Sequence, residues 1–163
     1  TGLRVSSLYN TFGDKAALYQ RAVQHYLDSF VRPRLARFAG PEASLEDLEQ
    51  LLTSLLEEPL NDGYGCLVTN AVLEQGGSGG PAAGLVKTTF DELHQHAEDV
   101  LRREIGVDDA AIAAARVLLL YQGLLVFSRA GFAGELHGAA VRDEFTRLRA
   151  QRDRINAPKE KQK

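Results

Sequence analysis

Apolar residues recur at helical spacing along most of the chain, while the alternation typical of β-strands is almost absent. The first long helix is expected to begin at a capping residue, Asp14, and to end near Pro33, with residues 34–43 as a connector. Its apolar face is predicted to consist of Leu18, Ala22, Tyr26 and Phe30. The pattern as a whole predicts an all-α fold.

Local signals place the next helices. Ser44 and Asp47 resemble a capping box, with the shorter Asp in place of Glu, and they precede a run of leucines at helical spacing. These leucines are Leu45, Leu48, Leu52, Leu55 and Leu56. A turn, a short helix over about 66–75 and a glycine-rich loop follow, and Pro81 suits the first turn of another helix. The predicted apolar face of that helix is Leu85, Thr89, Leu93, Ala97, Val100 and Leu101.

The last two predicted helices differ from the others in their apolar pattern. Asp108 or Asp109 can cap a helix that runs to about Gly131, and its stretch Val117–Tyr121 is apolar all round, which requires burial on every side. The final helix has apolar residues alternately four and three apart, a spacing typical of a helix that packs on a partner helix. Periodicity allows either a homodimer interface or a core within one chain. For the dimer, the predicted interface is Leu118, Tyr121, Val141, Phe145 and Leu148.

The composition is that of a soluble globular domain: 163 residues, 44% apolar and 25% charged. The sequence contains no Met, so we expect it to be part of a longer protein. Cys66 is the only cysteine, which excludes an intrachain disulfide. The longest apolar run, Val117–Phe127, falls short of the roughly 20 residues that span a bilayer, so we expect no membrane contact and a cytoplasmic location.

The formal net charge of −3 hides an asymmetry along the chain. Residues 1–40 carry a local net charge of +4, and the rest of the chain carries −7. The basic residues of the first segment are Arg4, Lys15, Arg21, Arg32, Arg34 and Arg37. A basic front on an acidic body indicates that the front binds a polyanion such as nucleic acid.

Residues 2–15 carry the pattern that points most directly to a function. A glycine turn precedes a short helix that begins with small polar residues. Small side chains let a helix enter the DNA major groove, where hydroxyl and amide groups read base edges. Tyr9, Thr11 and Lys15 are placed to reach phosphates, and the backbone amides at the start of the next helix add a further phosphate site.

The segment Leu8–Phe12 (Leu-Tyr-Asn-Thr-Phe), followed by Lys15, resembles the end of the recognition helix and the start of the linking helix in the TetR family of bacterial repressors. Gly65-Cys66 resembles the opening of the sixth helix in many members. The apolar helix that contains Gly123, together with the last helix, resembles the dimerisation pair of the family.

The sequence departs from the family pattern at Val5, where members often have a basic residue, and at Thr11, where they often have a histidine. The first helix of the family and most of its second have no counterpart here, so we expect this chain alone to bind operator DNA poorly. The resemblance implies a recognition helix over about 4–11. The implied DNA contacts are Arg4, Val5, Ser6, Ser7, Tyr9, Asn10, Thr11 and Lys15.

The resemblance also implies a mechanism: a repressor that a small-molecule effector releases from a palindromic operator. Residues 1–33 would be the remainder of the DNA-binding domain with the linking helix, 34–156 the effector-binding and dimerisation domain, and 157–163 a frayed tail. A homodimer through the last two helices would set two recognition helices roughly 34 Å apart. A hydrophobic or aromatic effector is expected to bind among Tyr26, Phe30, Asn70, Phe90, His94, Tyr121, Leu124 and Phe127.

Two other classes of function stay open. A helical ligand-binding sensor module that binds no DNA would share the same body. An enzyme is disfavoured, because Gly76–Gly80 matches the Gly-x-Ser-x-Gly pattern of hydrolases without the strand it needs, and His94 with Glu98 has no third metal ligand. Cys66 is expected to be a small buried side chain rather than a redox sensor. We therefore expect no catalysis, cofactor or metal.

Overall fold

The computed structural model describes residues 5–57, 64–75 and 79–157, and only the backbone of Val5–Ser7 and Gln75. Every regular element within these ranges is helical, which confirms the all-α prediction. Most of the predicted turn and of the glycine-rich loop lies outside the described residues, as do Arg4 and all but the first residue of the predicted tail 157–163.

The chain begins with α1 (Val5–Phe12), within one residue of the predicted 4–11 helix, and α2 (Lys15–Tyr26) follows. Gly13 between them has a φ of 94°, a conformation that glycine adopts without strain. The Asp14 carboxylate accepts a hydrogen bond from the Ala17 backbone N–H at 2.8 Å, so the predicted cap is confirmed. The Arg21 guanidinium lies 5.9 Å from the centre of the Phe12 ring and joins α1 to α2.

The helix does not end near Pro33. It passes from α2 through a π-helical segment, η1 (Leu27–Val31), into α3 (Arg32–Phe38), so the predicted connector is wrong for its first five residues. The Arg32 backbone N–H closes the π turn on the Leu27 carbonyl. Pro33 is tolerated because it lies in the first turn of α3, where a missing N–H disrupts least.

The buried face of this long helix is displaced by one residue from the predicted face. Its buried positions are Val23, Leu27, Val31, Leu35 and Phe38. Ala22 and Phe30, from the predicted face, are exposed. A spacing of four residues turns a stripe by about 40° per step around an ideal α-helix. The π segment has more residues per turn and takes up this rotation, so that the stripe stays on one side.

The second predicted helix is present as α4 (Leu45–Thr53), which continues into a short 3₁₀ helix, η2 (Ser54–Leu56). The capping box is confirmed: the Ser44 backbone N–H donates to Asp47 Oδ2 at 2.9 Å, and the Asp47 N–H donates to Ser44 Oγ at 3.3 Å. Leu45, Leu48, Leu52 and Leu55 are buried as predicted, and Leu56 is half-buried. The predicted short helix is α5 (Leu67–Gln75).

The remaining elements are α6 (Ala83–Ile105), α7 (Val107–Arg129) and α8 (Glu135–Asn156). The predicted face of α6 is buried, except that Val86 replaces Leu85 as the first enclosed residue. Gly106 is the N-cap of α7, and the two predicted caps, Asp108 and Asp109, lie in its first turn, where their charge favours the helix dipole.

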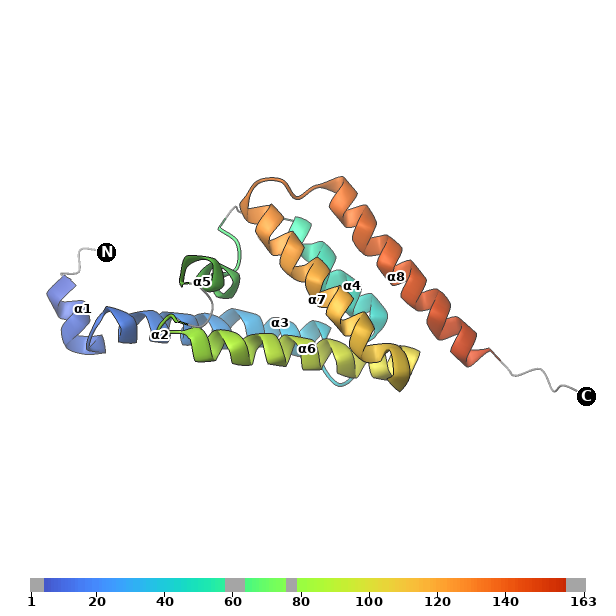
Figure 1. Ribbon diagram of the computed structural model, residues 1–163, viewed down its shortest axis with the longest axis horizontal. Coiled ribbons are helices and arrows are strands. Elements are labelled where there is room, and N and C mark those ends of the chain that lie inside the picture. Colours follow the sequence, from blue (N-terminus) through green and yellow to red (C-terminus); the bar gives the residue numbers. More distant parts are fainter. Residues whose placement is uncertain (1–4, 58–63, 76–78, 158–163) are drawn as a thin grey trace, which may run out of the picture.

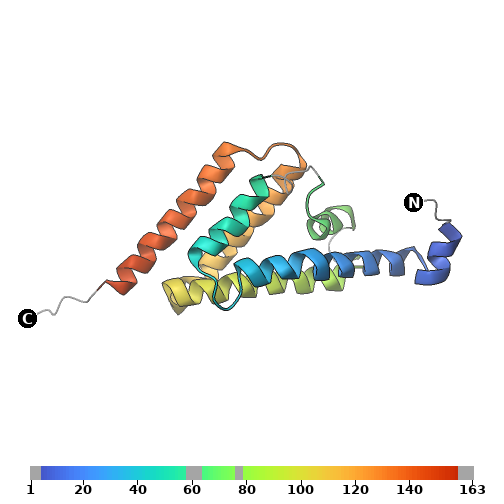
Figure 2. The ribbon, with the colours of Figure 1, turned by 180° about the vertical axis from the view of Figure 1, so that it is seen from behind.

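Figures 1 and 2 show the long helix α2–η1–α3 side by side with α6, with α1 at the far end from α8. The Arg32 guanidinium of α3 lies 3.3 Å from the Glu92 carboxylate of α6 and ties the two helices together. The helices α4, α7 and α8 slant away from this pair, and α8 packs on α4 (Figure 1). The helices α4, α7 and α8, which we call the body, therefore lie at one end of the long helix, and α1 lies at its other end (Figure 1).

Helix α7 has two contrasting faces. Ala113, Val117 and Leu124 are buried in the core, whereas Leu119 is 73% exposed and Ile112 is 61% exposed. The sequence predicts that this helix needs both its own core and another surface to cover it; the single chain provides the core, and the covering surface stays a prediction. By length and composition α7 could also cross a membrane, with a mean hydropathy of 1.9. The core helix of a soluble protein meets the same criteria.

Candidate functional site

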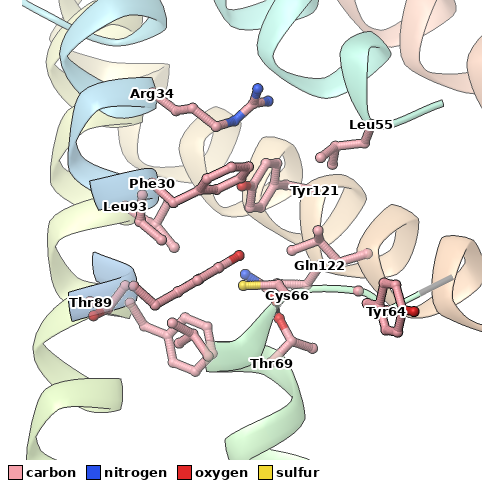
Figure 3. Close-up of a pocket in the computed structure, with 16 residues that line it drawn as sticks. Phe30, Arg34, Leu55, Tyr64, Cys66, Thr69, Thr89, Leu93, Tyr121 and Gln122 are labelled. Atoms are coloured by element: carbon pink, nitrogen blue, oxygen red, sulfur yellow. Dashed lines mark hydrogen bonds between the residues drawn. The ribbon is translucent and has the colours of Figure 1, made fainter. Parts of the chain in front are cut away.

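An apolar cavity of about 260 Å³ lies between the long helix and the body. The residues that line it come from α2, η1, α3, η2, α5, α6 and α7 and from the segment before α5 (Figure 3). They are Tyr26, Phe30, Val31, Arg34, Leu55, Tyr64, Gly65, Cys66, Val68, Thr69, Thr89, Phe90, Leu93, Tyr121, Gln122 and Leu125. Mostly apolar walls with a few polar groups are typical of a small-molecule site.

Four of the eight residues predicted for the effector pocket line this cavity. Tyr26 and Phe30 stack with their ring centres 5.5 Å apart on the long helix, and Phe90 and Tyr121 approach from α6 and α7. Phe30 is 43% exposed because it faces the cavity and not the core. The aromatic side chains give the cavity flat apolar surfaces on more than one side.

Two of the three tyrosines that line the cavity, Tyr26 and Tyr121, have hydroxyls that burial keeps neutral. Burial raises the pKa of Tyr121 to about 12, although the nearby Arg34 guanidinium acts in the opposite direction. Burial also raises the pKa of Tyr26 above its ordinary value, and the neighbouring Cys66 thiol adds to the shift. Both hydroxyls can therefore donate and accept hydrogen bonds at neutral pH without carrying a charge.

Other polar groups of the cavity are paired with one another or with the main chain. Thr69 Oγ1 of α5 donates to Gln122 Oε1 of α7 at 2.9 Å, and Thr89 Oγ1 donates to the Leu85 carbonyl at 2.8 Å. Arg34 Nη2 donates to the Leu51 carbonyl at 3.2 Å and to Ser54 Oγ at 3.0 Å. Figure 3 shows Arg34 extending from α3 on the same side of the cavity as Phe30 and Tyr121.

The other four predicted pocket residues lie elsewhere. The Asn70 side chain donates to the Tyr64 carbonyl at 3.0 Å, and His94, which does not line the cavity, lies 3.6 Å from Glu98. Leu124 and Phe127 face α8, because the cavity takes the Tyr121, Gln122 and Leu125 side of α7 instead. Of the predicted pocket residues, Tyr26, Phe30, Phe90 and Tyr121 therefore line the cavity, and the other four do not.

The sequence analysis missed Arg34 and Gln122 as cavity residues. Arg34 was assigned to a connector, since the predicted helix ended near Pro33. Gln122 was visible as the single polar interruption of the apolar run Val117–Phe127, and that interruption marks the cavity side of α7. A polar residue inside an otherwise apolar buried stretch needs a hydrogen-bond partner, which Thr69 provides.

The predicted DNA contacts lie on α1 and at the start of α2. Tyr9, Asn10, Thr11 and Lys15 are exposed. The backbone of Val5, Ser6 and Ser7 forms the first turn of α1. Figure 1 places α1 away from the body, at the end of the long helix. The exposed residues are therefore accessible to a large partner.

The predicted dimer residues Val141, Phe145 and Leu148 are not available to a partner. Each is 0% exposed, because α8 turns this stripe onto α4 within the same chain. Tyr121 faces the cavity, and Leu118 is half-buried against the core. The correction follows from packing, since a side chain enclosed by its own chain has no surface left for an interface.

The exposed apolar surface of the last two helices lies at other positions. A groove of about 240 Å³ runs between α7 and α8. It is lined by Leu119, Leu120, Gly123, Leu124, Phe127, His137, Ala140 and Val141. A Cβ built on Gly123 would meet nothing within 4 Å, so packing within the chain does not require a glycine there. At its rim, Leu136 is 84% exposed and Phe132 is 66% exposed.

The other candidate chemistry is limited in the part of the chain that the structure describes. Cys66 is a buried free thiol at the cavity. No group of three or more His, Cys, Asp or Glu side chains among the described residues could hold a metal ion. The absence of a metal, a cofactor and catalysis stays a prediction.

Comparisons of the chain with protein-family models, with curated proteins and with solved structures gave no match, so the geometry above and the residues themselves carry the functional argument.

Proposed function

We propose that this chain is a DNA-binding transcriptional regulator of the TetR type, a cytoplasmic, non-enzymatic repressor that a small apolar or aromatic effector releases from a palindromic operator. The observation that carries the proposal is the single helix α2–η1–α3. It holds the exposed α1 at one end, and further along it supplies Tyr26 and Phe30 to the cavity wall. A ligand in the cavity thus contacts the element that positions α1.

The π segment η1 is the part of this helix best suited to change conformation. Its hydrogen bonds span five residues, and a π turn inside an α-helix often marks a functional site. Phe30 and Val31 of η1 line the cavity. From Lys15 to Phe30 the helix is about 24 Å long, so a tilt of about 5° at η1 moves α1 by about 2 Å.

The energetics required of such a coupling are modest. An effector that favours the tilted state needs a coupling free energy of only about 1–3 kcal/mol to weaken operator affinity measurably. Aromatic contacts with Phe30 and Tyr26 that exist in one state and not the other are of this size. We therefore assign the two-state behaviour to η1, and the contact that differs between the states to Phe30 of η1 and Tyr26 at the end of α2.

The proposal includes a homodimer through α7 and α8. Their outward face carries Leu119, Phe127 and Leu136, which are all exposed in the single chain. Gly123 in the middle of this face costs about 1 kcal/mol of helix stability relative to alanine, and close approach of a second helix backbone explains it. The interface is thus proposed at the groove between α7 and α8 and not at the enclosed side chains of Phe145 and Leu148.

An electrophoretic mobility shift tests the proposal. It uses the product of the intact gene and DNA from the region upstream of that gene, with and without a panel of hydrophobic ligands. We expect a sharp, salt-sensitive shift that one ligand class releases. Asn10→Ala, on exposed α1, should weaken binding about tenfold, whereas Gln95→Ala, exposed on α6, should leave it unchanged.

The second candidate is a helical ligand-binding sensor that binds no DNA. The position of the cavity favours it as an alternative, because none of the lining residues belongs to α1. An intact, dimeric protein that binds a ligand in the cavity and shifts no upstream DNA would replace the regulator proposal with this one.

A further inference from the structure

Arg34 is the charged residue of the cavity. The other described residues that line it are apolar or neutral and polar. The guanidinium is anchored through Nη2 to two neutral acceptors at the end of α4, the Leu51 carbonyl and Ser54 Oγ. The Arg34 side chain also donates a hydrogen bond to the Tyr121 hydroxyl, and these bonds together hold the head group at the cavity while using only part of its five N–H donors.

Arg34 also differs from three other arginines, which join helices of this fold through carboxylates. Arg32 pairs with Glu92, Arg149 with Glu49 and Arg152 with Glu104. Among the described residues, no carboxylate lies within ion-pair distance of Arg34. A cation that is half-buried beside apolar walls without a counter-charge is unfavourable, and an anion in the cavity would relieve this cost.

We propose that the ligand of this cavity is an aromatic or aliphatic acid, whose carboxylate pairs with Arg34 while its apolar part lies against Phe30, Phe90 and Tyr121. The regulatory consequence of binding rests on the function proposed above, but the ligand class does not. Guanidinium and carboxylate groups match in geometry and form charge-assisted hydrogen bonds. The neutral Tyr121 hydroxyl beside Arg34 adds a donor and brings no competing negative charge.

A matched pair of probes tests this ligand class by isothermal titration calorimetry on the 163-residue chain. The acid probe is 2-naphthoate, and its uncharged counterpart of nearly the same shape is 2-naphthamide. We expect the acid to bind about ten- to hundredfold more tightly than the amide, as for a hydrogen-bonded charged group. Equal affinities, or no binding of the acid, would overturn the proposal.

Variants of two neighbouring arginines assign the effect to its residue. Arg34→Gln should abolish the preference for the acid. Arg37→Gln removes the same charge one helical turn further on, outside the cavity lining, and should retain the preference. Because Arg34 also ties α3 to α4, the Arg34→Gln result counts only if circular dichroism shows that the variant is folded. Arg34→Lys keeps the charge in either case and should retain a reduced preference.

The outcomes separate this inference from the proposed function. A preference for the acid that survives Arg34→Gln, in a folded variant, would overturn the role of Arg34. The calorimetry contains no DNA, so a protein that selects the acid through Arg34 but shifts no operator supports the ligand class and refutes the regulator. A protein that shifts operator DNA but binds the two probes equally supports the regulator and refutes the proposed ligand class.

Discussion

The substitution Leu119→Ala tests whether Leu119 is an interface residue or a core residue. An interface residue affects the dissociation of the dimer, whereas a core residue affects the unfolding of the monomer. Leu119 is 73% exposed in the single chain, so truncating it should change the free energy of unfolding of the monomer by less than about 0.5 kcal/mol. Full burial of a leucine is worth about 1.5–3 kcal/mol, so burying the exposed part against a partner contributes about 1–2 kcal/mol per protomer.

In a two-fold symmetric dimer the same substitution occurs twice. The dimer should therefore lose about 2–4 kcal/mol, which raises its dissociation constant about 30- to 1,000-fold. Sedimentation equilibrium over a range of concentrations measures the constant, and urea unfolding measures the stability of the monomer. Leu73→Ala is the matched control, since Leu73 is 62% exposed on α5 and does not line the groove between α7 and α8. An unchanged dissociation constant for Leu119→Ala would refute the interface.

Three further predictions concern the fold. Phe145→Ala, at a fully enclosed position, should lower the free energy of unfolding by about 3–5 kcal/mol in urea titrations at any protein concentration, and an effect on dimerisation alone would contradict its place in the core. Asp14→Ala should cost about 1 kcal/mol through loss of the α2 cap, and an unchanged unfolding midpoint would remove that role. Hydrogen bonds from Ser44 lower the pKa of Asp47, so the stabilising effect of its carboxylate is present above about pH 4 and is lost as the pH falls through the folded-state pKa. Asp47→Asn should flatten that part of the acid-unfolding curve. Identical curves for the two proteins would exclude this contribution of Asp47.

The local signals in the sequence were reliable because each depends on a few adjacent residues. Asp14 and the pair Ser44 and Asp47 cap helices as predicted, since a side-chain oxygen three residues before an orphan amide reaches it in almost any context. Pro33 misled the prediction, because a proline in the first turn after a π segment does not end a helix.

Local sequence patterns were enough to predict that the chain is helical, roughly where its helices begin and which residues are apolar enough to be buried. Which partner each apolar stripe meets depends on how the helices pack in three dimensions. Val23 and Tyr26 belong to two stripes with the same residue spacing. Packing of the helices encloses Val23 in the core, whereas Tyr26 lines the cavity. Phe145 is enclosed by α4, although the same periodicity suits a dimer. Arg34 is the charged residue of the cavity because helices that are distant in sequence pack together around it. Periodicity along one helix does not predict such contacts between distant helices.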